Sequence, residues 1–261
     1  MGTSRKRADM AQARVVYAMP GMERVVVRHG VPYQTDHDMT LTMDVYTPPG
    51  TAHGARLPAV TFVFGYPDAA IEARLGSKLK DVGQYVCWGR LAASSGLIGV
   101  TYETAQPESD IHAVLAHIRE HAAALGIDAD RIGLWACSGN VPVALAALTG
   151  EPVRCAVLYY GYMLDWPGSH IVTEAAQRVG FANPCAAGTF DPLLVARAGR
   201  DGVRLNETID RFVREARSRD VPLTLVDYAG GRHAFDIVDD TERSRQIVRQ
   251  TLAFMRAQLL E

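Results

Sequence analysis

The sequence lacks the features that would direct a protein to a membrane or to nucleic acid. No apolar run approaches the ~20 residues that a helix needs to cross a bilayer. The formal charge is only −2 at pH 7, so there is no excess of basic residues to attract nucleic acid or an anionic membrane surface. Internal repeats and low-complexity segments are missing as well. Membranes and nucleic acids are therefore not expected among the partners.

Cysteine is scarce, and the four that are present are Cys87, Cys137, Cys155 and Cys185. They show no short paired spacing of the kind found in metal sites and disulfide frameworks. The start of the chain, MGTSRKRADMAQ, is basic but lacks the apolar core of a signal peptide. In a chain without an export signal, free thiols and a cytoplasmic location are the simplest expectation. Residues 1–20 are expected to form a disordered tail.

The composition is that of an ordinary globular protein. Hydrophobic residues make up 48% of the 261 residues and charged residues 21%, which is typical of a folded chain. A chain of this length can form one α/β domain of generous size without a second domain. Residues 21–261 are expected to form that single domain.

Apolar, β-branched runs alternate with amphipathic segments along most of the chain. Strands are expected at 23–31, 41–46, 57–64, 97–102, 132–135, 155–160, 192–198 and 222–228, and helices at 82–93, 110–125, 141–148, 206–217 and 243–260. The first two strands are expected to form an antiparallel hairpin. The β–α alternation that follows indicates a mostly parallel sheet of about eight strands with helices on both faces. Ligands bind at the carboxyl ends of the strands in such sheets, so the loops there are the candidates for chemistry.

The segment from Arg131 to Leu148, RIGLWACSGNVPVALAAL, joins an expected strand to an expected helix through a sharp turn. Only small or polar residues, Ala136 to Asn140, lie between the two. Small neighbours let the central side chain of such a turn protrude, and the amides that open the helix can receive a developing negative charge. Ser138 is therefore a candidate nucleophile. The alternative is an ordinary strand–helix turn with a capping serine.

This turn resembles the nucleophile elbow of the α/β-hydrolase superfamily, and the chain resembles its esterase/lipase and dienelactone-hydrolase-like branches. The family pattern is Gly-x-Ser-x-Gly, whereas this chain has Ala136 and Asn140 in place of the two glycines. Cys137 offers a competing register, as in the dienelactone-hydrolase branch. That register would place the bulky Trp135 at a tight position of the turn, so Ser138 is favoured and Cys137 is interpreted as a small packing residue.

Two later loops offer the partners that a nucleophilic serine needs, a base and a carboxylate that orients the base. The α/β-hydrolase resemblance implies the chain order Ser, then Asp or Glu, then His. Asp201 follows the expected strand at 192–198, and His233 follows the expected strand at 222–228. The resemblance therefore assigns Asp201 as the acid and His233 as the base of Ser138. Either residue alone could be an ordinary loop residue, but all three stand in the required order.

The resemblance also implies an oxyanion hole, made by the amide after the nucleophile and an amide of the loop after the third strand. Gly139 supplies the first amide. The second falls at Phe64-Gly65-Tyr66, where many relatives have His-Gly-Gly. Gly65 lets the backbone approach a substrate, and the Tyr66 N–H is the candidate donor. Phe64 replaces the family histidine, and Tyr66 could instead be a plain wall of the pocket.

An aromatic excursion after the strand at 155–160 completes the expected site. The resemblance implies that it forms a small cap over about residues 162–190. The substrate-binding candidates are Gly65, Tyr162, Met163, Trp166, His170 and Phe235. An aromatic cap favours an apolar acyl or aryl group in the pocket, although such side chains can equally pack the cap itself.

One helix carries His117-Ile118-Arg119-Glu120-His121, which matches the His-x-x-Glu-His pattern of inverted metalloproteases. On a helical wheel Glu120 lies opposite the apolar face, and His117 lies near Glu120. Both side chains are therefore expected to point to solvent. No third acidic ligand is evident. Neither a metal nor an organic cofactor is expected.

The function that these residues predict is serine hydrolysis, most simply by a carboxylesterase that acts on small acyl or aryl esters through an acyl-enzyme. The same triad serves thioester, lactone, peptide and carbon–carbon bonds on this fold, so the bond stays open. A non-catalytic ligand-binding protein is the other alternative, since Phe64, Ala136 and Asn140 depart from the family pattern. The expected partner is a small ester-like molecule, and a homodimer is left open.

Overall fold

A computed structural model describes residues 10–36, 39–178 and 191–260 of the chain. Its strands pair into one eight-stranded sheet in the order β1-β2-β4-β3-β5-β6-β7-β8. The strands are β1 Val26–Asp36, β2 Met39–Thr47, β3 Leu57–Phe62, β4 Ile98–Tyr102, β5 Ile127–Cys137, β6 Cys155–Tyr159, β7 Leu193–Ala198 and β8 Leu223–Tyr228. β2 runs antiparallel to both of its neighbours, and all other neighbouring pairs are parallel. The expected mostly parallel sheet is confirmed.

Continuous apolar sequence produces the centre of this sheet. Every residue of β4 and of β6 is buried, as is usual for parallel strands that are covered on both faces. The edge strand β8 is only partly buried. At the opposite edge, the hairpin of β1 and β2 contains two register shifts. Arg28 fixes this hairpin to the body of the protein by donating hydrogen bonds to the carbonyl oxygens of Ala124 and Leu125.

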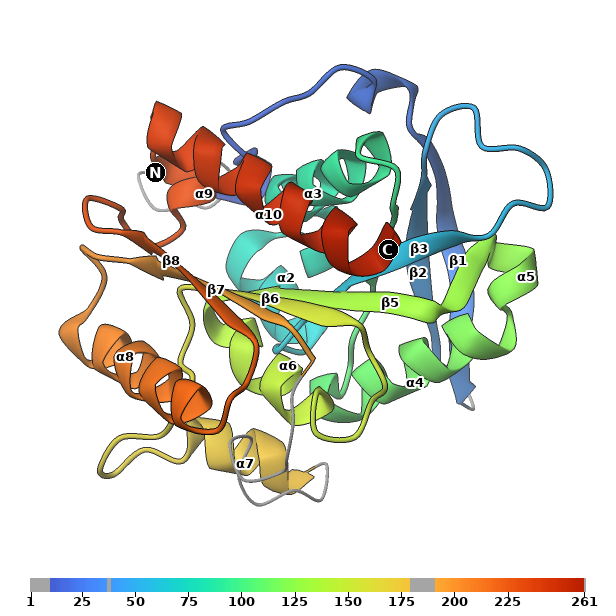
Figure 1. Cartoon of the computed structure of the whole chain (residues 1–261). Helices are drawn as coiled ribbons and strands as arrows, with labels where there is room; N and C mark the ends of the chain where they lie inside the picture. The colour runs from blue at the N-terminus through green and yellow to red at the C-terminus, as the bar shows by residue number, and fades with distance from the viewer. Residues whose placement is uncertain (1–9, 37–38, 179–190, 261) are drawn as a thin grey trace.

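Helices cover both faces of the sheet (Figure 1). α3 Gly83–Ser94 and α10 Glu242–Leu260 lie on one face, and α4 Pro107–Glu120, α6 Val141–Ala147 and α8 Val203–Ser218 lie on the other. The shorter helices are α2 Asp68–Leu75, α5 Ala122–Leu125, α7 Ile171–Arg178 and α9 Phe235–Val238, and the 3-10 turns are η1 Met22–Arg24, η2 Leu79–Asp81 and η3 Ser138–Asn140. None of these described helices is both long and apolar enough to cross a bilayer.

The helices differ from the expectation at three points. The single helix expected at 110–125 is two, because His121 interrupts it between α4 and α5. α2, α7 and α9 were not expected, since helices of eight residues or fewer have too few turns for a clear apolar period. The helix expected at 206–217 begins three residues earlier, at Val203, and the buried Asn206 amide within it donates to the carbonyl oxygen of Ala198.

The expectation of a disordered tail is wrong for residues 10–20. Val15 is buried, and the Val16 N–H donates a 2.8 Å hydrogen bond to the carbonyl oxygen of Asp236. The segment thus crosses α3 and reaches the C-terminal part of the chain. Residues 1–9 lie outside the described residues, as does the later part of the expected cap, 179–190. A tail over residues 1–9, one domain over 21–261 and a cap therefore stay predictions.

Candidate active site

The turn between β5 and α6 holds Ser138 in a strained backbone conformation. Its φ angle is 55°, in the left-handed region that residues other than glycine rarely adopt. Strain of this kind persists only where surrounding structure fixes it, and it is common at functional sites. The turn is tight although neither family glycine is present at positions 136 and 140.

Glycines of two neighbouring loops make room for this turn. A Cβ atom at Gly161 would lie 2.5 Å from the carbonyl oxygen of Ser138, and one at Gly65 would lie 2.6 Å from that of Gly139. Both distances are far inside van der Waals contact, so the loops after β6 and β3 press directly on the turn. The missing glycine at position 140 is offset by Gly65 on the facing loop, where a Cβ atom would lie only 2.9 Å from the Asn140 Cα atom.

The three candidate catalytic side chains form one hydrogen-bonded chain. The Ser138 Oγ atom lies 2.7 Å from Nε2 of His233, and Nδ1 of His233 lies 2.5 Å from Oδ2 of Asp201. Because the carboxylate accepts from Nδ1–H, Nε2 is the acceptor for the serine hydroxyl in the neutral ring. The residues follow β5, β7 and β8 at the same edge of the sheet. The structure therefore brings together the three positions that the sequence analysis selected.

Backbone contacts hold the acid and the base in place. The Gly202 N–H donates to the second oxygen of Asp201 at 2.7 Å, and the Arg200 N–H donates to the carbonyl oxygen of Gly231 at 2.9 Å. The second bond ties the Asp201 loop to the His233 loop. The Asp201 side chain is 11% exposed and that of His233 is 41% exposed, so the acid is shielded while the base remains open to the cleft.

A buried aromatic and acidic cluster lies behind His233. The ring of Tyr160 meets the imidazole edge-to-face, with 5.0 Å between the ring centroids. The Tyr160 hydroxyl donates to Asp236, which also accepts from Gln84 at 2.8 Å and from Trp88 at 2.9 Å. Burial raises the pKa of the Asp236 carboxyl above its usual range, although these three donors act to lower it. The cluster connects α3 to the His233 loop.

Cys137 is placed differently from Ser138. Its side chain is buried, and its Sγ atom lies 3.5 Å from the Tyr85 hydroxyl. Burial raises the pKa of the thiol to about 12, so the thiol is protonated at neutral pH and is a poor nucleophile. Ser138, in contrast, lies within hydrogen-bonding distance of His233. This geometry favours the Ser138 register.

The loop after β3 lies against the turn where the oxyanion hole was expected. Gly65, Tyr66 and Gly139 all line the same cleft as Ser138. The Tyr66 side chain crosses Gly139 so closely that a Cβ atom there would lie 1.8 Å from the phenol oxygen. Phe64, which replaces the family histidine, is fully buried and packs on Tyr85 with ring centroids 4.8 Å apart. Phe64 therefore stands at the position of the histidine in the family pattern and is held there by aromatic packing.

The triad opens into a cleft of about 500 Å³. Its lining includes seven of the residues expected from the sequence: Gly65, Tyr66, Ser138, Gly139, Tyr162, Asp201 and His233. It also includes seven that were not expected: Glu108, Pro142, Val143, Ile171, Glu174, Ala175 and Leu205. Ile171, Glu174 and Ala175 share one face of α7 at a spacing of three and four residues, but the helix is too short for that spacing to reveal them from the sequence.

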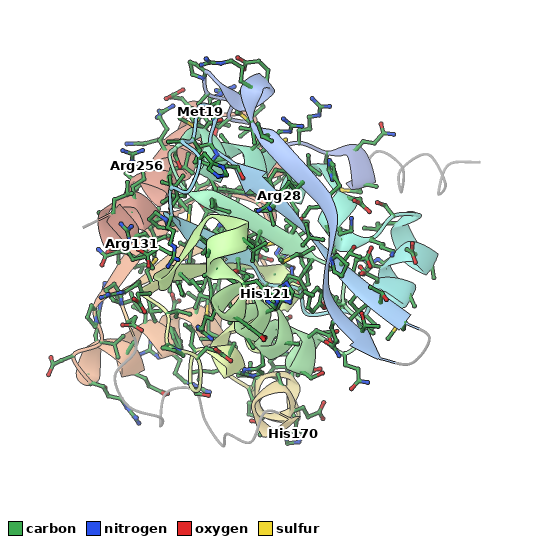
Figure 2. The ribbon with its side chains drawn as sticks, turned by 90° about the vertical axis from the view of Figure 1, so that its right-hand side faces the viewer. Met19, Arg28, His121, Arg131, His170 and Arg256 are labelled. Atoms are coloured by element: carbon green, nitrogen blue, oxygen red, sulfur yellow. The ribbon has the colours of Figure 1, made fainter. Side chains whose placement is uncertain are left out.

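Four of the expected substrate-binding residues do not line this cleft. Met163 and Phe235 are fully buried, and Phe235 packs among Tyr159, Tyr160 and Tyr228 in the core. Trp166 packs against the ring of Tyr162 at a tilt and lines a separate hollow against α8. His170 is exposed at the start of α7, on the periphery of the molecule (Figure 2). The aromatic content of the excursion was evident, but not which side chains turn inward.

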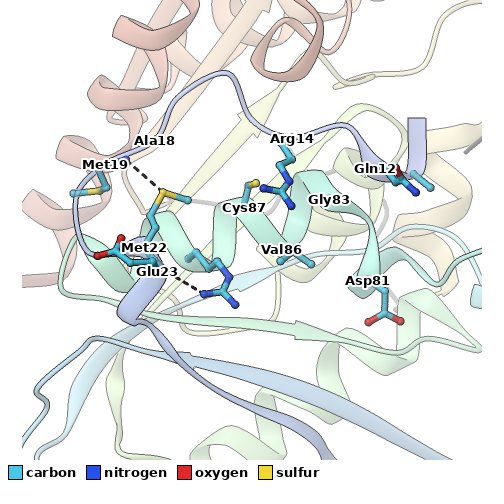
Figure 3. A pocket seen from close by; sticks show the side chains of 12 residues that line it. Gln12, Arg14, Ala18, Met19, Met22, Glu23, Asp81, Gly83, Val86 and Cys87 are labelled. Atoms are coloured by element: carbon cyan, nitrogen blue, oxygen red, sulfur yellow. Dashed lines mark hydrogen bonds between the residues drawn. The ribbon is translucent and has the colours of Figure 1, made fainter. Parts of the chain in front are cut away.

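A second hollow of about 770 Å³ lies between the segment 11–23 and α3 (Figure 3). Its lining contains none of the triad residues. Cys87 lies within it, and burial raises the pKa of this thiol.

The rings of His117 and His121 stack on each other with centroids 4.1 Å apart, and the described ranges contain no cluster of three or more His, Cys, Asp or Glu side chains placed to hold a metal.

Sequence comparison finds no matching family model and no matching curated protein. Solved structures do match. An esterase of Thermogutta terrifontis, Est2, is similar with a TM-score of 0.70 at 17% identity, covering 91% of this chain and 94% of that one. A bacterial heroin esterase is similar with a TM-score of 0.68 at 18% identity, covering 94% of this chain and 87% of that one. At such identities the likeness shows the fold, and the expected α/β-hydrolase fold is confirmed.

Proposed function

We propose that the protein is a serine hydrolase, and specifically a carboxylesterase for small acyl or aryl esters. The observation that carries this proposal is the chain of two hydrogen bonds, 2.7 and 2.5 Å long, that joins Ser138 to His233 and His233 to Asp201 at the wall of an open cleft. A ligand-binding protein has no need of an aligned hydroxyl, base and carboxylate. The structural neighbours described as esterases support the same class.

Acylation begins with the transfer of the Ser138 proton to Nε2 of His233 while Oγ attacks the ester carbonyl. The Asp201 carboxylate keeps the proton on Nδ1 and stabilises the imidazolium that forms. The oxygen of the tetrahedral intermediate becomes negative, and the amides of Gly139 and Tyr66 are assigned to bind it. The imidazolium then gives its proton to the departing alcohol, which leaves the acyl group on Ser138.

Deacylation repeats these steps with water. His233 takes a proton from water as it attacks the acyl-enzyme, and the proton returns to the Ser138 oxygen when the carboxylic acid leaves. Apart from the ester and the water that is consumed, both halves of the reaction as written use only groups of the chain. The exposure of His233 to the cleft is consistent with the entry of water at this step.

The lining of the cleft supports a small, largely apolar acyl group. Pro142, Val143, Ile171, Ala175 and Leu205 contribute apolar surface, which favours an acyl chain over a charged one. The esterase of Thermogutta terrifontis has been solved with propionate and with butyrate bound. Aryl esters of acids from acetate to octanoate therefore form the first substrate series, with thioesters, lactones and peptides as the comparison set.

Labelling with a fluorophosphonate, followed by mass spectrometry of the adduct, tests the nucleophile. We expect modification of Ser138, none in Ser138→Ala, and much slower labelling in His233→Ala, because the serine then lacks its base. An adduct on Cys137 would assign the chemistry to the thiol. A folded protein that neither reacts with the reagent nor hydrolyses any member of the series would instead be a binding protein.

A further inference from the structure

Asn140 occupies the position where the family pattern has a glycine, two residues after Ser138. It lies at the start of α6, but its side chain caps nothing in that helix. The side chain is instead buried, at 3% exposure, beneath the loop that follows β3. A buried amide requires hydrogen-bond partners at both ends, and the identity of those partners points to a role for Asn140.

Both ends of the Asn140 side chain are bonded, to two different parts of the fold. Its Oδ1 atom accepts a 2.8 Å hydrogen bond from the Gly65 N–H. Its Nδ2 group donates a 2.7 Å hydrogen bond to the hydroxyl of Tyr85 in α3. Asn140 therefore joins the nucleophile turn to a loop that lies 75 residues away in the sequence.

The two bonded backbones are also those that carry the candidate oxyanion donors. Gly139, which supplies one amide, immediately precedes Asn140, and Tyr66, which supplies the other, immediately follows Gly65. Gly65 and Asn140 are in direct contact, since a Cβ atom on Gly65 would lie 2.9 Å from the Asn140 Cα atom. The spacing of the two amides is therefore set at the Asn140–Gly65 contact.

Tyr85 contacts both parts of this arrangement. Its ring packs edge-to-face on Phe64, the residue before Gly65, with the centroids 4.8 Å apart. Its hydroxyl receives the Asn140 amide. Tyr85 thus contacts both the nucleophile turn and the loop after β3. The Asn140 side chain joins these two segments by its hydrogen bonds. A glycine at position 140 would have no side chain to make that link.

We propose that Asn140 is a positioning residue that holds the Tyr66 and Gly139 amides at the spacing that a tetrahedral oxyanion requires. The proposal rests on the serine-hydrolase function and adds to it a residue that does not touch the substrate. Preorganised donors act on the transition state much more than on the bound ester. Loss of the link should therefore lower kcat and leave KM almost unchanged.

Three variants separate the hydrogen bond from the volume of the side chain. Asn140→Gly restores the family residue and removes the link, and Asn140→Leu keeps the branched shape without the acceptor. We expect kcat for an aryl ester to fall about 10- to 100-fold in both, since misplacing a reacting group by about 1 Å costs up to ~10²-fold. Asn140→Asp keeps the acceptor for Gly65, and the Tyr85 hydroxyl can donate to it. Its kcat should lie within several-fold of wild type.

A trifluoromethyl ketone, which forms a tetrahedral oxyanion on serine, reports the hole directly. In Asn140→Gly, the inhibition constant of this ketone should rise by the same factor as kcat/KM falls. The inhibition constant of the matching methyl ketone, which lacks the fluorine atoms and is not attacked by the serine, should stay the same. A merely structural role would not separate the two inhibitors. Thr251→Val is the control, because it removes a buried hydrogen bond between Thr251 of α10 and Tyr159 of β6 and should leave both constants and kcat unchanged.

The outcomes distinguish this inference from the function on which it rests. A wild-type protein that hydrolyses no ester and reacts with no fluorophosphonate would overturn both. An active wild type whose kcat and ketone affinity persist in Asn140→Gly and Asn140→Leu would overturn the role of Asn140 alone. Equal weakening of both ketones would also overturn it, because that pattern indicates a damaged pocket rather than misplaced amides.

Discussion

Replacing Gly65 by alanine perturbs a close backbone contact between the two loops that carry the candidate oxyanion donors. The added Cβ atom would lie 2.6 Å from the Gly139 carbonyl oxygen and 2.9 Å from the Asn140 Cα atom. Both are backbone atoms, so no side chain can rotate away to relieve the clash. The loop after β3 and the nucleophile turn must separate by roughly 1 Å to restore ordinary contact distances.

That separation has two measurable consequences. Overpacking of this kind costs about 1–3 kcal/mol in the free energy of unfolding, which a domain of ordinary stability tolerates. The same movement carries the Tyr66 amide away from the Gly139 amide, and a displacement of about 1 Å at a reacting centre can lower the rate ~10²-fold. We therefore expect Gly65→Ala to be folded but to have kcat/KM reduced about 100-fold.

The assay is hydrolysis of a short aryl ester at a temperature well below the unfolding midpoint, with urea unfolding in parallel. Gly202→Ala is the matched control, because nothing lies within 4 Å of the position where its Cβ would stand and its φ of −55° suits alanine. It should retain wild-type kinetics although it adjoins Asp201. If Gly65→Ala had wild-type kcat/KM and wild-type stability, the close approach of the two loops, and the oxyanion assignment with it, would be refuted.

Two further predictions concern the buried groups behind the triad. Burial raises the pKa of Asp236 in the folded protein above its unfolded value near 3.8, so the folded state binds the proton more tightly. The free energy of unfolding of wild type, relative to Asp236→Asn, should therefore fall as pH rises above 3.8 in urea titrations; a difference independent of pH would contradict this. Cys137→Ala should keep its esterase activity and its fluorophosphonate adduct on Ser138, because the Cys137 thiol is protonated at neutral pH. Loss of labelling in a stably folded Cys137→Ala would contradict the assignment.

The sequence predicted the central sheet from local composition, and it predicted the three candidate catalytic positions from the strands of that sheet together with the resemblance to the α/β-hydrolase superfamily. Strands such as β4 and β6 are short, continuous apolar runs that are buried along their whole length, so local composition marks them clearly. Ser138, Asp201 and His233 lie within five residues of the ends of β5, β7 and β8, three strands that were expected from the sequence. Parallel strands place their carboxyl ends at one edge, and three local signals therefore became one site without knowledge of any long-range contact.

What the sequence could not predict depends on contacts between distant segments. Asn140 looked like a defect in the family pattern, because its partner Gly65 lies 75 residues earlier. Met163 and Phe235 had the apolar character of a binding wall, but both face the core. The basic start of the chain gave no sign that Val15 is buried. Side-chain direction in loops is set by the packing of the whole fold, and local composition does not encode it.

One wall of the cleft has an origin separate from that of the reactive groups. The acid, the base and the nucleophile stand on strand ends of the sheet, whereas Tyr162, Ile171, Glu174 and Ala175 all come from the excursion between β6 and β7. Exchange of that one stretch would alter the shape offered to an incoming molecule while leaving the reactive groups where they are. Natural or laboratory selection can thus change which molecules the cleft accepts by changing only the stretch between β6 and β7.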